Sequence, residues 1–309
     1  MRVGLSWEIR GEAPAGPLWT GVIDAIREAD ALGFESAWVA ETQGSAAACT
    51  QPAVFLTYAA RVTRSIHLRA LGRSVKGEIP VRLAEEVTLL DLFSHGRGGV
   101  AYASGRSQSI APSAVHEVIE FARAAWMTNE IRYRGDHVRF PEHTPDSAPR
   151  GPSYIPWEGE YVPQWEWGAA RSTADFLALT PKPMSIHVPT YVSIDDDETL
   201  EWAARNGVSP YAGVDLTTAE ACERLARYRR IADSVGRHGF EVDAVIERNV
   251  ALDGASDAHT FGGSTHDIAC AIREAAAATR ASHFVWRHRP GTPGDLGRFA
   301  NEVQVKLQA

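Results

Sequence analysis

Two short stretches of this sequence carry carboxylates or hydroxyls directly after an apolar run. Glu41 and Thr42 follow the run at residues 36–40, and the acidic residues 195–198 follow the run at 190–194. A carboxyl group can exchange protons near neutral pH when burial raises its pKa, whereas a Thr hydroxyl stays protonated unless a base activates it. We therefore take Glu41 and Thr42 as candidate catalytic residues, with Glu41 as the proton carrier. The alternative is an ionised Glu41 held by hydrogen bonds beneath a strand end.

The elements that must position these groups alternate between the hydrophobic period of a strand and that of a helix. Residues 31–105 read as strand, helix, strand, helix, strand, with Gly and Pro at the joints, and this alternation predicts a parallel sheet. The count of strands predicts an α/β fold, a (β/α)8 TIM barrel. An open doubly wound sheet is the weaker alternative, because no Gly-x-Gly-x-x-Gly turn follows the first strand. The eight candidate strands are residues 3–7, 36–40, 66–71, 99–103, 190–194, 208–212, 244–252 and 283–286.

In such a barrel the chemistry gathers at the C-terminal ends of the strands. That rule selects two sets of residues from the predicted strands. For contacts to a cofactor it selects Ala70, Tyr102, Ser104, Ser193, Asp195 and Asp196. For contacts to a substrate it selects Trp7, Tyr211 and Trp286, whose alternative role is to fill the top layer of the core.

The segments that connect these elements also contain distinctive sequence motifs. They read ALGFESAWVAE, AARVTRSIHLRA and PVRLAEEVTLLDLFSHGRGGVAY. These motifs resemble the Gly-Phe-Asp/Glu-x-x-Trp, Thr-x-x-Ile-x-Leu and Leu-Asp-x-x-Ser-x-Gly-Arg patterns of the bacterial luciferase-like monooxygenase superfamily. The resemblance continues in VPTYVSIDDDETLEWAARNGV and SHFVWRHRPGTPGDLGRFANEV, so it covers most of the chain. It implies a single barrel domain over residues 1–309.

The resemblance implies a flavin-dependent monooxygenase. Reduced FMN from a separate NAD(P)H-dependent flavin reductase would react with O2, and one oxygen atom would enter a small organic substrate. We expect an apolar, natural-product-like substrate, because the Ala- and Arg-rich composition suggests a high-GC genome. A homodimer formed through helices of the first half is also implied. The family often has Glu-His-His where this chain has Glu41, Thr42 and Gln43.

A second departure lies after the fifth strand. In the family, Ser or Thr side chains and a helix N-terminus hold the flavin phosphate there. The turn in this chain starts at Ser193, and Thr199 matches a phosphate-side position, but Asp196 stands where a Ser is expected. Asp195 and Asp196 would each repel a phosphate by about 1 kcal/mol per charge pair even at high dielectric, and Asp is also a favoured helix cap. Arg106 is the candidate to replace the arginine that the family supplies to the phosphate.

Residues 142–178 form an insertion after the fourth helix that breaks the alternation. They are rich in Pro and Gly but also carry Trp157, Trp165 and Trp167. A loop of this length in a compact domain is usually a lid, a binding loop or disordered, and its aromatic content argues against disorder. We expect a lid over the barrel mouth whose tryptophans contact the substrate. An oligomer contact and a locally packed surface loop are the alternatives.

Composition excludes several classes of protein. A net charge of −8 without a concentrated Lys/Arg stripe argues against a nucleic-acid partner. No apolar run is long enough to span a bilayer and no leader precedes the first strand, so we expect a cytoplasmic protein without a membrane partner. The three cysteines and eleven histidines show no ligand spacing, so no metal site is expected.

Three other functions remain open from the sequence. A deazaflavin-dependent dehydrogenase or reductase shares the fold and would transfer hydride without O2. A repurposed barrel that no longer binds flavin would explain the acidic turn and the missing histidine. An isomerase or lyase could use Glu41 and Asp195 as acid and base.

Overall fold

The computed structural model describes residues 1–11, 15–44, 46–128, 131–140, 179–237, 243–289 and 294–308. Eight parallel strands close into a ring, in which β9 pairs with both β8 and β11, so the predicted (β/α)8 barrel is confirmed. Each of the eight predicted strands is present within one or two residues of its expected position. The ring strands are β1 (Arg2–Glu8), β2 (Ser36–Ala40), β3 (His67–Arg73), β4 (Gly98–Tyr102), β7 (Thr190–Ser193), β8 (Ser209–Ala212), β9 (Val245–Leu252) and β11 (His283–Arg287).

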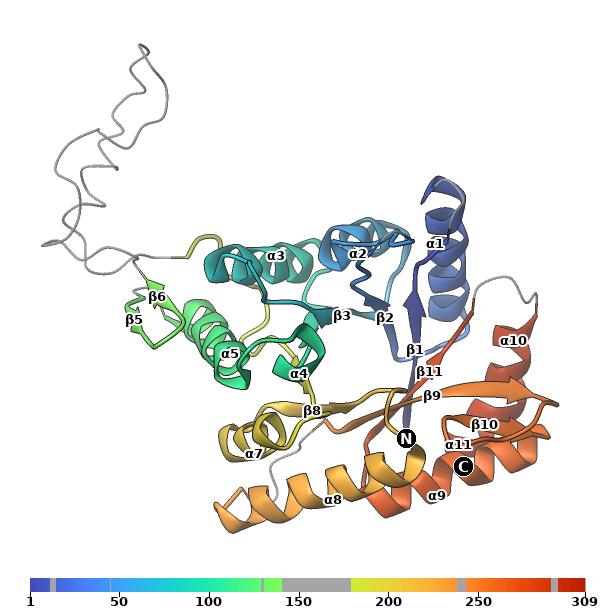
Figure 1. Ribbon diagram of the computed structural model, residues 1–309. Helices are drawn as coiled ribbons and strands as arrows, with labels where there is room; N and C mark the ends of the chain where they lie inside the picture. The colour runs from blue at the N-terminus through green and yellow to red at the C-terminus, as the bar shows by residue number, and fades with distance from the viewer. Residues whose placement is uncertain are drawn as a thin grey trace, which may run out of the picture.

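Helices surround the ring, and Figure 1 shows α1 to α3 on one side of the strands and α7 to α9 on the opposite side. Proline at the first turn starts α2, α3 and α5, where its missing N–H costs nothing. The helices are α1 (Ala15–Ala31), α2 (Pro52–Val62), α3 (Pro80–Phe93), α4 (Gly105–Gln108), α5 (Pro112–Met127), α7 (Asp197–Asn206), α8 (Thr218–Ser234), α9 (Thr265–Thr279), α10 (Asp295–Phe299), η1 (Ala300–Gln304) and α11 (Val305–Gln308). Three short strands lie outside the ring: β5 (Tyr133–Arg134), β6 (Arg139–Phe140) and β10 (Thr260–Gly263).

Side chains of the ring strands alternate between two separate hydrophobic clusters. On β1, Val3, Leu5 and Trp7 belong to the large cluster between the strands and the helices. The interior of the ring holds a smaller cluster in which Trp38 packs against Tyr211 with ring centroids 5.3 Å apart. Because successive strand residues point to opposite faces, the ring strands other than β1 each supply a residue to the interior cluster as well. The interior cluster comprises Trp38, Leu71, Ala101, Tyr191, Tyr211, Val245 and Val285.

A bulge near the end of β3 interrupts this alternation. The register between β3 and β4 shifts between Ala70 and Arg73, and Gly72 adopts a left-handed conformation with φ +64°. Only glycine takes that conformation without strain. The extra residue sends Arg73 outward toward α3 rather than into the ring.

The turn between α3 and β4 holds the opposite end of the barrel together. Asp91 accepts hydrogen bonds from the backbone N–H and the hydroxyl of Ser185, at 2.8 and 2.7 Å. Arg97 donates to the backbone carbonyls of Ser94 and Ile66, at 2.9 and 2.8 Å. Both residues therefore serve the fold at the N-terminal end of the strands. In the part of the chain that the structure describes, none of the helices combines the length and apolar character needed to cross a bilayer.

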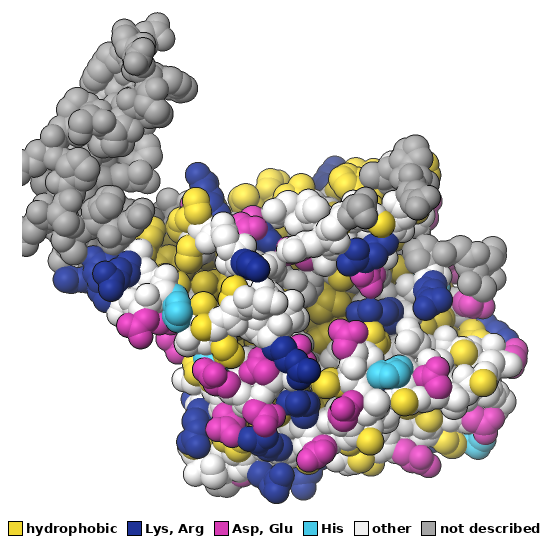
Figure 2. Space-filling view, viewed as in Figure 1, with side chains coloured by type: hydrophobic (Ala, Val, Ile, Leu, Met, Phe, Trp, Pro, Cys, Tyr) yellow, Lys and Arg dark blue, Asp and Glu magenta, His cyan; other side chains and the backbone are white. Residues whose placement is uncertain are grey.

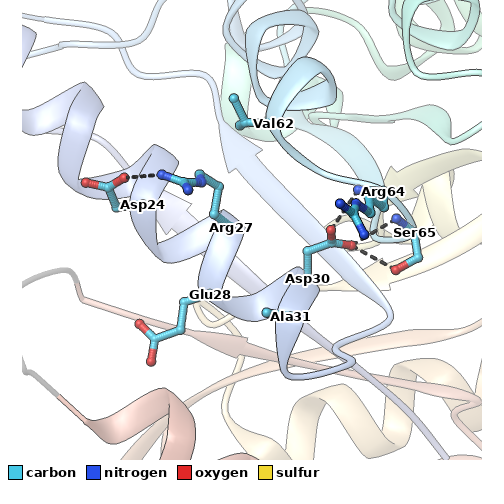
Figure 3. A pocket seen from close by; sticks show the side chains of 8 residues that line it. All are labelled: Asp24, Arg27, Glu28, Asp30, Ala31, Val62, Arg64 and Ser65. Carbon is cyan, nitrogen blue, oxygen red and sulfur yellow. Dashed lines mark hydrogen bonds and ion pairs between the residues drawn. The ribbon is translucent and has the colours of Figure 1, made fainter.

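Asp30, at the end of α1, joins that helix to the loop before β3. It borders the hollow in Figure 3, of ≈ 600 Å³, and its carboxylate accepts the backbone N–H groups of Arg64, Ser65 and Ile66 at 2.7, 2.9 and 2.7 Å. Burial alone would raise the pKa of Asp30, but these three N–H groups hold the pKa below its ordinary value. The carboxylate is therefore ionised when it ties the two elements together.

We expect Asp30→Ala to lower the free energy of unfolding by about 1–2 kcal/mol, the usual cost of removing a side chain that caps backbone N–H groups. Because the folded-state pKa is lowered, this contribution is present at neutral pH and disappears as the pH falls through the acid range. Urea denaturation of parent and variant at several pH values measures both effects. Asp24→Ala is the control, because Asp24 contacts Arg27 only at 3.4 Å on the surface. Equal effects of the two substitutions would contradict the assignment.

Candidate functional site

A charged group lies inside the ring at the C-terminal ends of β1, β9 and β11. Arg287 donates through Nε and Nη2 to the two carboxylate oxygens of Glu247, at 3.1 and 3.2 Å, and Ser6 donates to the same carboxylate at 2.5 Å. Nη1 of Arg287 also donates to Glu8 at 3.4 Å. Glu247 is 0% exposed, whereas the Arg287 side chain is 25% exposed and reaches the opening. These residues form a rigid ion-paired group at the barrel mouth, in which the Glu247 and Glu8 carboxylates offset the charge of Arg287.

The charge on Arg287 is permanent. Burial opposes it, but the paired Glu247 carboxylate raises the pKa of the guanidinium above its ordinary value. Nearby, burial and then the Glu247 charge raise the pKa of the Tyr211 phenol well above its ordinary value. Both side chains are therefore hydrogen-bond donors at any working pH. They can contact an electron-rich or anionic group that enters the mouth.

A second polar region lies across the mouth, after β7. Asp195 is largely buried, and burial raises the pKa of its carboxyl above the ordinary value, with Ser104 partly offsetting the rise. Among the described residues, its Oδ1 atom has no hydrogen-bond partner. Arg106 donates to the backbone carbonyl of Asp195 at 3.3 Å. The carboxyl of Asp195 is thus a group that can hold a proton beside the barrel opening.

Asp196 and Thr199 cap the start of α7. One carboxylate oxygen of Asp196 accepts the Thr199 backbone N–H at 2.6 Å, and the other accepts the Thr199 hydroxyl at 2.9 Å. The Thr199 side chain is buried, and its hydroxyl also lies 3.3 Å from Nε2 of His116. Ser104 is likewise an N-cap, because its hydroxyl accepts the Ser107 N–H of α4 at 3.2 Å. These three predicted cofactor residues therefore have structural partners within the chain.

Glu41 is one of three carboxylates around Arg73. The Arg73 side chain is 2% exposed and contacts Glu41 at 2.6 Å, Glu86 at 3.1 Å and Glu78 at 3.4 Å. Glu41 also accepts the Ser74 backbone N–H at 2.9 Å. Both contacts occupy the Glu41 carboxylate within the fold. The geometry favours the alternative expected from the sequence, a Glu41 held by hydrogen bonds beneath the strand end.

Thr42 ties the loop after β2 to neighbouring backbone. Its hydroxyl accepts the Cys49 N–H at 2.9 Å and lies 3.2 and 3.1 Å from the carbonyls of Ile9 and Cys49. The residue is fully buried. These contacts use the hydroxyl for structure, and none of them activates it as a nucleophile or base.

Four predicted site residues lie on the outer face of the ring, which corrects the expectation that their side chains line the mouth. Trp7 donates its indole N–H to His288 at 3.1 Å, and Trp286 stacks on Phe299 of α10 with ring centroids 4.9 Å apart. Ala70 and Tyr102 also belong to the cluster between strands and helices. The rule that chemistry gathers at the C-terminal strand ends predicted where these residues lie along the barrel axis. It did not predict whether each side chain faces the helices or the interior of the ring.

The remaining predicted residues divide differently. Tyr211 points into the ring, and Ser193 and Asp195 end or follow β7 at the mouth. Trp157, Trp165 and Trp167, together with the predicted lid at residues 142–178, lie outside the described residues.

The sequence prediction missed the group formed by Ser6, Glu247 and Arg287. A signal for it exists in β9, which reads VIERNVAL and places Glu247 and Arg248 side by side in an otherwise apolar strand. One of two adjacent strand residues must face inward, so a charge inside the ring could be expected. Figure 2 shows that the molecular face beside α4 is hollowed, with hydrophobic side chains inside the hollow and charged side chains around its rim.

Comparison with known proteins decides the family. The model of the luciferase-like monooxygenase family matches residues 1–260. The chain belongs to this family. Curated relatives include proteins of Mycobacterium tuberculosis, 26% identical over 166 residues, and Sinorhizobium fredii, 27% identical over 191 residues. These alignments cover 50% and 58% of this chain and 47% and 46% of the relatives, so the chain spans about half the length of the curated relatives it matches.

Solved structures of similar fold cover nearly the whole chain. The monooxygenase RslO1 from Streptomyces bottropensis matches with a TM-score of 0.76 and 18% identity, over 99% of both chains. The oxygenating constituent of 3,6-diketocamphane monooxygenase from Pseudomonas putida, solved with FMN, matches with a TM-score of 0.71 and 14% identity, over 99% of this chain and 98% of that one. An F420-dependent secondary alcohol dehydrogenase gives a TM-score of 0.72 and 12% identity, over 100% and 99%. At these identities the likeness concerns the fold.

The Arg73 cluster predicts a large effect on stability. Arg73→Met removes the counter-charge of Glu41 and Glu86, and breaking a buried ion pair costs about 3–5 kcal/mol. Burial already raises the pKa of Glu86. Without Arg73 its folded-state pKa rises further, so the stability lost by the variant is greater at pH 8 than at pH 5.

Chemical denaturation at the two pH values measures this loss. Arg82→Met is the control. Arg82 lies on α3, the helix that carries Glu86, and forms an exposed pair with Glu85 at 2.8 Å. A loss below about 1 kcal/mol for Arg73→Met, or one equal to that of the control, would show that the cluster does not hold the strand ends together.

Proposed function

We propose that this protein is a flavin-dependent monooxygenase that inserts one oxygen atom from O2 into an apolar, natural-product-like organic substrate. Family membership supports the reaction class, and the observation that carries the proposal is the partly exposed Arg287 guanidinium, which Glu247 holds in place at the barrel mouth. Reduced FMN would come from a separate NAD(P)H-dependent reductase. A cytoplasmic location would place the protein beside that reductase.

Arg287 is the side chain that supports flavin binding at the mouth, because its guanidinium is partly exposed and Glu247 fixes its donors in place. Below it in the barrel, Leu71, Ala101 and Val285 form a buried apolar layer. When bound, a reduced flavin supplies the electrons that activate O2. The chain would contribute orientation of the ring and fixed hydrogen-bond donors near it. The start of α7 does not fit an anionic tail, because Asp196 already occupies its donors.

Asp195 is the side chain that we assign to proton transfer in this reaction. Its raised pKa, its unpartnered oxygen and its place at the end of β7 support the role, whereas Glu41 is held by Arg73. The ordinary pKa of Asp lies near 4, so only a carboxyl raised toward neutrality is protonated under working conditions. Glu41 and Thr42 then act as positioning residues for the strand end.

Anaerobic titration with reduced FMN, oxidised FMN and the deazaflavin F420 tests this function. We expect reduced FMN to bind at micromolar concentration and Arg287→Met to weaken its binding about tenfold, a loss of about 1.4 kcal/mol. Arg27→Met, on the exposed face of α1, is the control and leaves binding unchanged. Oxygen-dependent turnover of the bound flavin completes the test.

Other results would replace the proposal. Preference for F420, with hydride transfer in the absence of O2, would establish the deazaflavin-dependent dehydrogenase instead. No binding of any of these cofactors would leave a barrel that has lost its flavin and has another function.

The helices α1 to α3 present an apolar surface that supports a homodimer. Val54 and Tyr58 of α2 are 65% and 62% exposed, and Trp19 of α1 and Phe93 of α3 are also exposed. A groove of ≈ 710 Å³ runs between α1 and α2. Exposed apolar patches of this kind mark contact surfaces. We propose that a second copy of the chain covers this surface.

Light scattering after size-exclusion chromatography measures the oligomeric state. We expect a dimer for the parent chain, and a monomer for Val54→Asp combined with Tyr58→Glu, because two buried charges would oppose association. Val235→Asp is the control: Val235 is 40% exposed and follows α8, on the opposite side of the ring from these helices. A monomeric parent chain at micromolar concentration would contradict the dimer.

A further inference from the structure

At the start of α7, the Asp196 carboxylate already binds hydrogen-bond donors that a ligand could otherwise use. Asp196 binds two donors of this turn, the backbone N–H and the hydroxyl of Thr199, so a ligand cannot use them. His116, which contacts the Thr199 hydroxyl, adds no charge, because burial lowers the pKa of its ring to about 4. A phosphate at this turn would have to displace a covalently attached anion that already makes the same hydrogen bonds.

Charge around this turn is unfavourable for a phosphate as well. Asp197 and Glu198 follow the cap in the first turn of α7. Arg224 and Arg227 of α8 pair with Asp197 at 3.1 and 2.9 Å, and Arg224 also donates to the backbone carbonyl of Ile194 at 3.2 Å. Arg106 donates to the backbone carbonyl of Asp195. Each carboxylate opposes a dianion by about 1 kcal/mol in water and more where water is excluded.

The starts of α8 and α9 are also capped by acidic side chains. At α8, Thr217 and Glu220 form a capping box, with the Glu220 carboxylate accepting the Thr217 N–H at 2.8 Å. At α9, Ser264 and Asp267 form another, with the Asp267 carboxylate accepting the Ser264 N–H at 3.0 Å. Helix N-termini are the usual phosphate sites in barrels of this type. In α7, α8 and α9 an acidic side chain of the same helix start occupies that position.

From these contacts we infer that the chain selects its flavin by the ring alone and does not recognise a 5′-phosphate. This inference rests on the proposed function. Its consequence is that riboflavin, which has the same ring and ribityl chain but no phosphate, binds at least as tightly as FMN. The Arg287 group supplies the polar contacts to the ring, and the ribityl end lies near Asp195, whose carboxyl group suits hydroxyls better than a dianion.

Fluorescence titration of the parent chain with riboflavin and with FMN tests the inference by binding alone. We expect a ratio of Kd for FMN to Kd for riboflavin of one or more. Asp196→Ser should keep the helix cap, because Ser is as good an N-cap as Asp, and should tighten FMN about tenfold without changing riboflavin. Glu198→Gln is the matched control, since it removes one negative charge from the same turn but leaves Asp196 bound to Thr199.

Each outcome has a distinct meaning. Riboflavin binding equal to or tighter than FMN binding, with an FMN-specific gain in Asp196→Ser, supports the inference. FMN binding at least tenfold tighter than riboflavin binding in the parent chain overturns it, while the proposed flavin function stands. Equal gains in Asp196→Ser and Glu198→Gln overturn the role of the cap in favour of general charge. Failure of both flavins to bind overturns the proposed function itself.

Discussion

Strict alternation of side chains around a closed ring of parallel strands is the constraint on which this site depends. A strand residue faces either the helices or the interior, and its neighbour faces the other way. Trp286 and Arg287 illustrate the consequence: the indole packs on Phe299 of the helical layer, and the guanidinium enters the mouth beside Glu247. Chemistry is therefore available only to every second residue of each strand.

Two arginines, Arg287 inside the ring and Arg73 outside it, are paired with carboxylates. Arg287 faces inward, and Glu247 holds it where a ligand can reach it. Arg73 faces outward because the bulge at Gly72 turns it there, and Glu41 and Glu86 neutralise it between the strands and α3. Buried charges of this kind are costly unless paired, so each cluster fixes the strand ends that carry it. We propose that the Arg287 cluster serves ligand binding, whereas the Arg73 cluster stabilises the strand ends.

The strands and the barrel could be predicted because short apolar runs bounded by Gly and Pro carry strong local signals. The faces of Trp7, Ala70, Tyr102 and Trp286 could not be fixed in the same way, because an apolar strand buried on both sides has no polar partner to set its phase. The contact between Glu41 and Arg73 could not be predicted either, because it depends on the bulge at Gly72, which the sequence marks only by a glycine.

The chain belongs to the luciferase-like monooxygenase family. We propose that its barrel mouth takes an electron-rich ring at Arg287 and that the acidic start of α7 opposes an anionic tail. Loss of the phosphate site would not abolish flavin chemistry, since the ring carries the reactive atoms. It would change which form of the cofactor the protein takes from solution.

A crystal structure of the chain grown with riboflavin tests the central claim most directly. The account predicts a ring inside the strand ends, in contact with Arg287 and Tyr211, and a ribityl chain that leaves α7 capped by Asp196. A ring bound outside the barrel, or a mouth that stays empty at saturating riboflavin, would contradict it.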